Sequence, residues 1–524
     1  MPTRFSRRRF LQASLAAFAS QSLLSGQSTL AGQSALAGQN ALAKSLDSLA
    51  AATGKPSPNI LFVVFDDLND WVNCLGGYPG TIHTPNIDAL AASGTLFTNA
   101  HTAIPLCNAS RTSTLTGLSP LQTQVFYNTT QWRELPHLKQ TLTLPQQFRA
   151  KGYRTVGAGK IFHFHDAASW DEFWPDNVHG FPPEPHEPDN EHPLKGGPPQ
   201  NRIDASFDWG VVDTPIEQTP DYQVADHIIR TLQTPQTHPL FLGCGFGKPH
   251  LPWYLPKSCF DRYPLESVQL PAVLKNDLDD VPPAAKALIN EYIHNDIVRL
   301  GFWKQAVQGY LASITFADEQ LGRVLTALRQ SPLTDNTIIV LWSDHGWHLG
   351  EKLQWRKLTL WEEATRIPLI LSGPGIHAGQ RCDAPVSLLD VAPTLGDLCQ
   401  LSTSEKLPGH SMKPLLQSCD ADWPYAAVTM WQMEKGNHFA LRDRQYRYIR
   451  YADGTEELYD HRTDPHEWHN LLATQGKTVP ENIAAIRLRM ATQLQSQLQS
   501  QSQSQSQPQT QIPNPAYEKT GGAP

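Results

Sequence analysis

The sequence predicts an α/β protein with a large, mostly parallel sheet flanked by helices, followed by a smaller C-terminal α+β domain. Two patterns carry this prediction. From about residue 55 to 405, short apolar runs alternate with amphipathic stretches, which is typical of a parallel sheet covered by helices. Beyond residue 409, apolar and aromatic runs lie close to a turn signal, which indicates antiparallel strands.

Four apolar runs are the predicted strands of the large sheet, and each leads into ionisable residues. The runs are 60–65, 154–157, 239–243 and 337–342. In open α/β sheets ligands bind beyond the carboxyl ends of the strands, so we expect the groups that follow the four runs to converge on one edge. A solvated turn explains any one of them but is a weak explanation for four together. The groups are Asp66 and Asp67, Lys160 and His163, Lys248 and His250, and Asp344 and His345.

The C-terminal domain is predicted to span residues 409–492. Residues 439–441 and 446–451 are its expected strands, with a turn at Asp453-Gly454. A final helix over about residues 480–495 is expected to close it.

Local composition marks a helix start, a long loop and a tail. Thr84 and Pro85 supply a cap residue and then proline at the first position of a helix over residues 86–91. Residues 166–202 are rich in Pro, His, Trp and Gly without a clear period, so we expect a long, ordered surface loop. Residues 493–524 are Gln- and Ser-rich and then contain Pro and Gly, which predicts a disordered tail.

The first residues indicate an export signal. Residues 6–11 (SRRRFL) precede a short apolar run to about Leu24, which resembles a twin-arginine signal and is too short to span a bilayer. Residues 1–43 are therefore the predicted signal and leader, with candidate cleavage sites at Leu36-Ala37 or Leu42-Ala43. We expect a bacterial protein exported to the periplasm or secreted, with the twin-arginine machinery as a partner and no stable membrane insertion.

Charge and cysteine content narrow the classes of function. The net charge of −8 gives no general attraction to polyanions, so nucleic-acid binding is disfavoured and an anionic substrate needs a local cationic pocket. The seven cysteines include no CxxC pair and no zinc-ribbon spacing, and their odd number leaves one outside any set of disulfides.

Cys107 is the candidate nucleophile. Residues 107–113 (CNASRTS) precede a plausible helix, so Cys107 is expected near a helix N-terminus and beside the Arg111 guanidinium, and both lower the pKa of a thiol. A buried structural cysteine and a thiolate paired with a histidine are the alternatives, and the local sequence leaves them open.

A family resemblance favours one interpretation. Residues 107–111 resemble the CxPxR or CxAxR signature of formylglycine-dependent sulfatases of the alkaline phosphatase superfamily, with Ala109 at the position that is most often proline. Asp344-His345 replaces the Asp-Asn of many sulfatases and is similar to the iduronate-2-sulfatase branch. The similarity runs from about Asn59 to Leu472. Its other motifs are residues 59–67, 84–88, 159–163, 248–252, 343–351, 457–460 and 464–465.

The resemblance implies an alkaline-phosphatase-like fold and hydrolysis of sulfate esters on a carbohydrate, favouring a 2-O-sulfated uronic acid at a chain end. It implies that a formylglycine-generating enzyme converts Cys107 to formylglycine (3-oxoalanine). It also implies a Ca²⁺ site, for which oxygen donors are suited. The implied ligands are Asp66, Asp67, Asp344, His345 and the hydroxyl of residue 107. Zinc at His345, His348 and Glu351 is an alternative, but the spacing is not HExxH and Gly346 argues against a regular helix.

The resemblance also implies roles for the remaining residues. Lys160 and Arg111 would hold the sulfate oxygens and the residue 107 hydroxyls, with Lys248 as a further candidate. Asp344 would deprotonate the attacking hydroxyl, and His250, assisted by Lys357, would protonate the leaving oxygen. His163 would take the proton of the second hydroxyl. Two alternatives stay open: a phosphate or phosphonate monoester hydrolase of the same superfamily, and a sulfated-glycan-binding protein with unmodified Cys107.

Overall fold

The computed structural model describes residues 57–183, 207–401, 407–434, 436–473 and 478–502. The predicted export signal and leader, residues 184–202 of the predicted loop and the tail beyond residue 502 lie outside the described residues. Within the described residues, no helix combines the length and the apolar character needed to cross a membrane.

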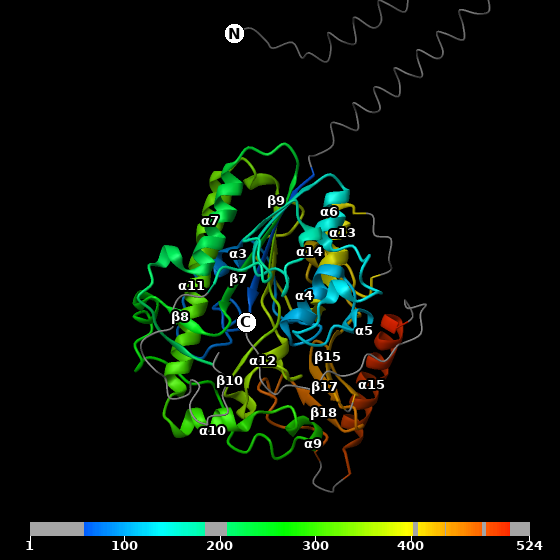
Figure 1. The fold of residues 1–524 in the computed structure, drawn as a ribbon. Coiled ribbons are helices and arrows are strands. Elements are labelled where there is room, and N and C mark those ends of the chain that lie inside the picture. The colour runs from blue at the N-terminus through cyan, green and yellow to red at the C-terminus, as the bar shows by residue number, and fades with distance from the viewer. Residues whose placement is uncertain (1–56, 184–206, 402–406, 435, 474–477, 503–524) are drawn as a thin grey trace, which may run out of the picture. The chain divides into compact units, whose positions relative to one another are not determined.

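The centre of the fold is an eight-stranded sheet (Figure 1). Strand β1 lies between β7 and β9 and is parallel to both, while β12 runs antiparallel to β9 and β2. The predicted fold class, a mixed and mostly parallel sheet flanked by helices, is confirmed. In spatial order the strands are β13 (Gln380–Cys382), β2 (Gly94–Phe97), β12 (Leu369–Ser372), β9 (Thr337–Ser343), β1 (Asn59–Asp66), β7 (Leu240–Pro249), β4 (Arg154–Gly159) and β5 (Glu172–Trp174).

The register of the central strands brings their carboxyl ends together. Every residue of β1 is buried, as a strand covered on both faces requires. Phe65, near its end, pairs with Ser343 of β9 and Phe246 of β7, and Gly245 pairs with Gly159 of β4. The carboxyl ends of the four predicted strands therefore lie at one edge of the sheet, as expected from the polar residues that follow them.

Helices cover both faces of the sheet (Figure 1). Alternate residues of β1 divide between the two apolar cores, because successive side chains of a strand point to opposite faces: Phe62 and Val64 belong to one core, Val63 and Phe65 to the other. The first core is covered by α4 (Cys107–Thr116), α6 (Leu144–Ala150) and α13 (Val391–Cys399), and the second by α3 (Pro85–Ala92), α7 (Pro220–Gln233) and α11 (Trp303–Gln330).

The second sheet is antiparallel and C-terminal. Its strands, in order, are β15 (Ala427–Met433), β16 (Gly436–Arg442), β17 (Tyr446–Arg450) and β18 (Glu456–Asp460). The expected turn at Asp453-Gly454 is present, since the Gly454 N–H donates to the Tyr451 carbonyl at 3.0 Å. The sheet contributes to the same apolar core as α4 and α13, and the Met430 N–H donates to the Ala103 carbonyl at 2.9 Å.

The closing helix is longer than expected. Helix α15 (Glu481–Ser502) continues beyond residue 495, so the prediction that the disordered tail starts at residue 493 is wrong. Leu494 and Leu498 are buried against the second sheet, and the Gln497 amide donates to the Ala426 carbonyl at 2.9 Å. Apolar residues at helical spacing thus order a segment whose average composition is polar.

Part of the predicted surface loop is a strand. Residues Glu172–Trp174 form β5, which pairs in parallel with β4 at the edge of the main sheet, and Ala167–Ser169 form a short 3₁₀ helix. The rule that strands are longer apolar runs misses a three-residue edge strand.

Short elements complete the described chain. Three small sheets pair β3 (Ala100–His101) with β14 (Val386–Ser387), β6 (Trp209–Val211) with β8 (Trp253–Leu255), and β10 (His348–Leu349) with β11 (Trp355–Arg356). The remaining short helices are α5 (Pro120–Thr123), α8 (Lys257–Phe260), α9 (Pro283–Lys286), α10 (Glu291–Arg299), α12 (Glu362–Thr365) and α14 (Lys413–Gln417).

Candidate active site

Cys107 is the first residue of α4 and is fully buried. Its Sγ lies 3.0 Å from Lys357 Nζ and 3.4 Å from His345 Nε2. Burial raises the pKa of the thiol, but the nearby positive charges, Lys357 first and then His345, together outweigh it, so the pKa lies below its ordinary value. Cys107 therefore occupies a strongly polar site, unlike a structural cysteine packed among apolar side chains.

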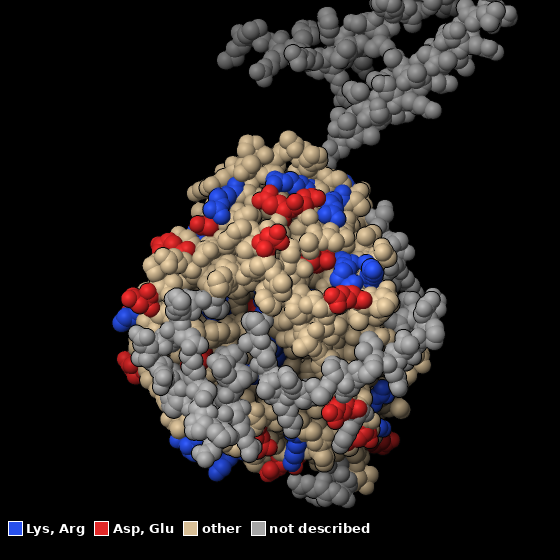
Figure 2. Space-filling model, in the orientation of Figure 1, with Lys and Arg blue, Asp and Glu red and all other residues tan. Residues whose placement is uncertain are grey.

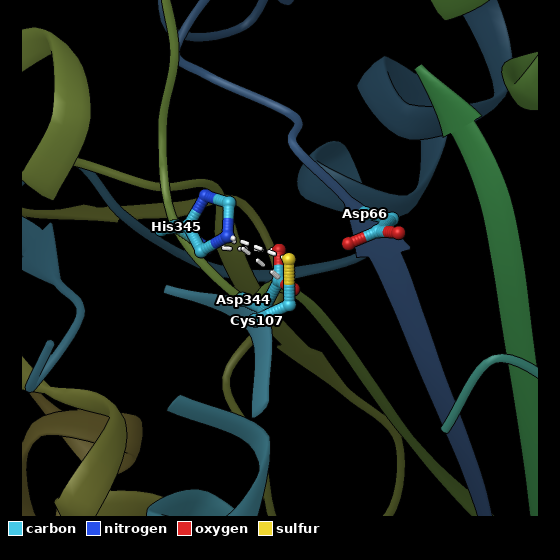
Figure 3. A group of neighbouring side chains, drawn as sticks. All are labelled: Asp66, Cys107, Asp344 and His345. Atoms are coloured by element: carbon cyan, nitrogen blue, oxygen red, sulfur yellow. Dashed lines mark hydrogen bonds and ion pairs between the residues drawn. The ribbon is translucent and has the colours of Figure 1, made fainter. Parts of the chain in front are cut away.

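Three buried carboxylates lie beside Cys107. Asp66 ends β1, Asp67 follows it, and Asp344 follows β9. Figure 3 shows Asp66 at the end of its strand, facing the Cys107 sulfur. Asp344 and His345 lie next to Cys107. One potential ligand atom from each of these four residues lies within 4.8 Å of the others.

These residues fit a hard divalent cation. Asp67 Oδ2 is buried and has no hydrogen-bond partner among the described residues. Burial raises the pKa of Asp67 to about 7 against the opposing charge of Lys357, so an additional cation would favour its ionised form. Nε2 of His345 lies 3.5 Å from Asp67 Oδ1 and 3.6 Å from Asp344 Oδ2. Carboxylate oxygens in this number are typical of a calcium site.

Arg111 braces the carboxylates. Its buried guanidinium donates to Asp344 Oδ2 at 2.8 Å and to Asp66 Oδ1 at 3.2 Å, and it also donates to the main-chain carbonyls of Lys160 and Ile161. Lys160 pairs with the other oxygen of Asp66. Burial by itself raises the pKa of Asp66, but the surrounding positive groups, led by Lys160 and Arg111, together hold that pKa well below its usual range.

Two histidines approach from other strand ends. Nε2 of His250, which follows β7, lies 3.8 Å from Asp67 Oδ2. Burial and the charge of Lys160 hold the pKa of both His250 and His163 well below the ordinary value. Nδ1 of His163 is buried without a hydrogen-bond partner among the described residues. Both rings are therefore neutral near pH 7 before substrate binds.

Lys357 lies on a segment with unusual backbone geometry. Lys352, Leu353, Arg356 and Leu358 have φ of +54°, +53°, +75° and +76°, a left-handed region that disfavours side chains with a Cβ. Lys357 Nζ lies 2.6 Å from Asp67 Oδ1. Its positive charge is thus held against the site by backbone that is unfavourable on its own.

Distant side chains impose this backbone. The buried Lys352 pairs with Asp277 at 2.7 Å. Beyond Lys357, the Glu362 N–H donates to Glu467 Oε2 at 3.0 Å, and Arg447 of the second sheet pairs with both glutamates. Glu362, His461 and Glu467 lie close enough together to hold a metal ion, but Arg447 and Arg442 already pair with the two carboxylates. The second sheet therefore supports the segment that carries Lys357.

The predicted site residues come together at this edge. His348 and Glu351 do not join them: His348 contacts Thr359 at 2.7 Å and Glu351 accepts from the Leu349 N–H at 2.6 Å, so the zinc alternative has no support. The Lys248 ammonium donates to the Pro252 carbonyl at 2.6 Å. The residues that meet are Asp66, Asp67, Cys107, Arg111, Lys160, His163, His250, Asp344, His345 and Lys357.

Two supporting residues escaped the sequence analysis. The Tyr310 hydroxyl on α11 donates to the Asp67 carbonyl at 2.7 Å and accepts from the Asn69 N–H at 3.0 Å. The Ser110 hydroxyl donates to the Asp344 carbonyl at 2.6 Å. Ser110 lies inside the 107–111 motif, which could have singled it out, whereas Tyr310 is one apolar position of a long amphipathic helix.

Comparison with known proteins gives the family. The profile named Sulfatase matches residues 58–401, and the profile named N-sulphoglucosamine sulphohydrolase, C-terminal, matches residues 350–500. A sulfatase from Formosa agariphila is 38% identical over 429 residues, covering 79% of this chain and 82% of that protein. Iduronate 2-sulfatase from Mus musculus is 32% identical over 392 residues, covering 67% and 70%.

Solved structures share the fold. A protein in complex with its substrate D-glucosamine-2-N,6-O-disulfate has a TM-score of 0.68 at 22% identity, covering 85% of this chain and 98% of that chain. The phosphonate monoester hydrolase of Agrobacterium radiobacter has a TM-score of 0.66 at 22% identity, covering 85% and 96%. Taken with the two profiles and the relatives, the 107–111 motif and the carboxylates beside it assign the chain to the sulfatase family, and it is a sulfuric ester hydrolase.

Proposed function

We propose that this sulfatase acts on sulfated carbohydrates through a formylglycine at position 107 and a bound Ca²⁺. The observation that carries the proposal is the environment of Cys107: a buried sulfur in contact with Lys357 and His345, beside three buried carboxylates. A structural cysteine has no need of such neighbours.

Asp66, Asp67, Asp344 and His345, with the oxygen of an oxidised residue 107, would hold the calcium. When bound, the cation would offset charge on the sulfate and acidify the hydroxyl of the formylglycine hydrate, which is the nucleophile. Arg111 would keep Asp66 and Asp344 in place through its hydrogen bonds at 3.2 and 2.8 Å.

Lys160 and Lys357 would bind the sulfate oxygens. A sulfate ester is anionic and repels an anionic nucleophile, so fixed positive charge at the sulfur lowers the barrier. Neither lysine lies on β1, the strand that ends at Asp66: Lys160 follows β4 and Lys357 follows β11. The two approach the site from separate segments, which suits a clamp on the sulfate.

Asp344, His250 and His163 would move the protons. Asp344 would accept the proton of the attacking hydroxyl, and His163 would accept the proton released at residue 107 when sulfate departs. His250 would protonate the leaving sugar oxygen, assisted by Lys357. His250 is neutral before substrate binds, and the negative charge of a bound sulfate would raise its pKa toward the protonated form.

We infer a 2-O-sulfated uronic acid, or a related unit of a sulfated polysaccharide, as the substrate. The 248–252 and 346–351 motifs support this, as do relatives named iduronate 2-sulfatase in Mus musculus and Homo sapiens. We also propose export by the twin-arginine route and oxidation by a formylglycine-generating enzyme. We further propose division into a catalytic domain (55–405) and a C-terminal subdomain that begins at residue 409 and includes all of α15.

Mass spectrometry across Cys107, combined with turnover of matched esters, tests the proposal. Conversion of the thiol to the aldehyde lowers the peptide mass by a fixed amount, whereas the peptide with Cys244, buried among apolar groups, is the unmodified control. Cys107→Ala should fold and lose turnover. Full activity with an unmodified thiol would refute the mechanism, faster cleavage of aryl phosphate than aryl sulfate would favour the phosphate or phosphonate hydrolase, and glycan binding without turnover would favour the binding protein.

A further inference from the structure

The turn that carries His250 begins at an irregularity of the main sheet. Strand β7 follows β1 in regular register until Phe65 pairs with Phe246, and the next pair joins Asp66 to Pro249. Gly247 and Lys248 are thus extra residues on β7. Bulges of this kind turn a strand end and redirect its side chains. Here the bulge sets where His250 leaves the sheet.

The two extra residues have a dedicated partner outside the sheet. Asp221, in the first turn of α7, is 1% exposed, and its carboxylate accepts from the Gly247 N–H at 2.6 Å and from the Lys248 N–H at 2.9 Å. A carboxylate that receives two consecutive main-chain donors makes charge-assisted hydrogen bonds with defined geometry. It replaces the strand partners that the bulge removes.

The rest of the turn is held by its own side chains. The Trp253 indole donates to the Pro249 carbonyl at 2.6 Å, and the Lys248 ammonium to the Pro252 carbonyl at 2.6 Å. The His250 N–H donates to the Gly247 carbonyl at 2.9 Å. Because the turn is tied internally, the Asp221 carboxylate determines how it sits against the sheet as a unit.

We propose that Asp221 is a positioning residue that places His250 for proton transfer to the leaving oxygen. This proposal rests on the proposed role of His250 as the acid. Asp221 reaches His250 through the 247–250 main chain, because its carboxylate accepts from the Gly247 and Lys248 N–H groups at the start of that turn.

The structure favours Asp221→Asn as the variant. Asparagine keeps one acceptor oxygen but turns an amide N–H₂ toward a main-chain donor, so one hydrogen bond is lost and the charge is removed. Displacement of a catalytic group by about 1 Å can cost about 100-fold in rate, so we expect a loss of about 10- to 100-fold on unactivated sugar sulfates. Asp226→Asn is the matched control, because Asp226 lies on α7 and is part-exposed in a pair with Arg323.

The test compares leaving groups. The leaving group of nitrophenyl sulfate is a stabilised phenolate that hardly needs a proton. Asp221→Asn and His250→Ala should therefore both lose much less activity on this ester than on a sugar sulfate. The double variant should be no slower than His250→Ala alone. Equal losses of Asp221→Asn on both substrates, wild-type activity, or additive losses in the double variant would each overturn the proposal.

A second variant tests the proposal if Asp221→Asn does not fold. Asp221→Glu keeps the charge and both acceptor oxygens but moves them by one methylene. It should show the same dependence on the leaving group, and a Glu variant without that dependence would overturn the proposal. If His250→Ala loses equally on both substrates, the acid role fails instead. Positioning is then judged by the double variant, which must still be no slower than His250→Ala.

Discussion

Asp67 shows how single residues shape the site. Its φ of +65° is uncommon for a side chain with a Cβ, although Asp and Asn tolerate it best. Tyr310 holds its carbonyl at 2.7 Å and Asp344 accepts from its N–H at 3.1 Å. The backbone conformation directs the carboxylate toward Lys357 and leaves one oxygen without a donor.

Asp67→Asn should weaken calcium binding while keeping the backbone, because asparagine tolerates the same φ but lacks the charge. Calcium at about 100 times its Kd stabilises the folded wild type by about 2.7 kcal/mol, and the variant should gain less at the same concentration. Thermal melts with and without Ca²⁺ measure this, with the exposed Asp420→Asn as the control. An unchanged calcium effect, or stoichiometric zinc without calcium in the purified protein, would contradict the assignment.

Sequence reasoning found the site residues that lie next to strand ends, because an apolar run followed by Asp or His is a local signal. Asp66 and Asp344 are examples. It missed Tyr310, whose contact with Asp67 spans 243 positions and depends on how α11 packs. Arg111 was expected to hold sulfate, whereas its guanidinium donates to two carboxylates and two main-chain carbonyls. Only the three-dimensional arrangement of those acceptors determines this role.

At the scale of elements, Arg447 links the second sheet to the segment that carries Lys357. Its guanidinium is 1% exposed and pairs with Glu467 at 2.5 Å and with Glu362, and it donates to the Leu360 carbonyl at 3.0 Å. The contact with Leu360 lies three residues from Lys357. The small sheet is thus part of the support of the active site.

Arg447→Met should destabilise the protein strongly, because it removes the buried positive charge that pairs with both Glu362 and Glu467. Loss of one partner of a buried ion pair costs about 3–5 kcal/mol, measured here by denaturant unfolding. Arg444→Met is the control: its pair with Asp383 is exposed, and such pairs contribute about 0–1 kcal/mol. Similar losses in the free energy of unfolding for the two substitutions would show that the buried ion pairs of Arg447 contribute no more stability than the exposed pair of Arg444.

Helix α15 allows a second comparison. Leu494 is fully buried and Leu488 is 64% exposed on the same helix. Leu494→Ala should cost about 2–5 kcal/mol through the lost contacts and the cavity, whereas Leu488→Ala should stay within about 0.5 kcal/mol. Denaturant unfolding of both variants tests the packing, and equal small effects would mean that the helix contributes little to the fold.

The same helix shows why composition underestimated order. Residues 493–502 are mostly Gln and Ser, which predicts disorder when averaged over a window. Order depends instead on a few leucines at helical spacing that meet the second sheet. The edge strand β5 makes the same point for strands, since its three residues are recognisable only through their pairing with β4.

For the whole molecule, the fold class followed from the alternation of apolar runs because that pattern is spread over the chain. The packing of the second sheet did not, since it depends on contacts between distant residues such as Ala103 and Met430. On the face shown in Figure 2, acidic and basic residues are interspersed, which agrees with the lack of a general attraction to polyanions inferred from the net charge.

We expect the two sheets to unfold together. One apolar core contains Leu395 of α13, which covers the main sheet, together with Leu441 and Tyr448 of the second sheet. Neither sheet can therefore lose its packing alone. Scanning calorimetry should show one transition, and fluorescence of the fourteen tryptophans should change at the same temperature. Two separated transitions would contradict the shared core.

The left-handed backbone around Lys357 also bears on the order in which the active site can be assembled. Chains are synthesised from the N-terminus and their domains fold in that order. Glu467, which holds Glu362, lies 105 residues further along, so it emerges from the ribosome well after the main sheet is complete. A growing chain can therefore pair β1, β4, β7 and β9 while Lys357 still lacks its support. The protein gains its complete site only when the last strands have been made.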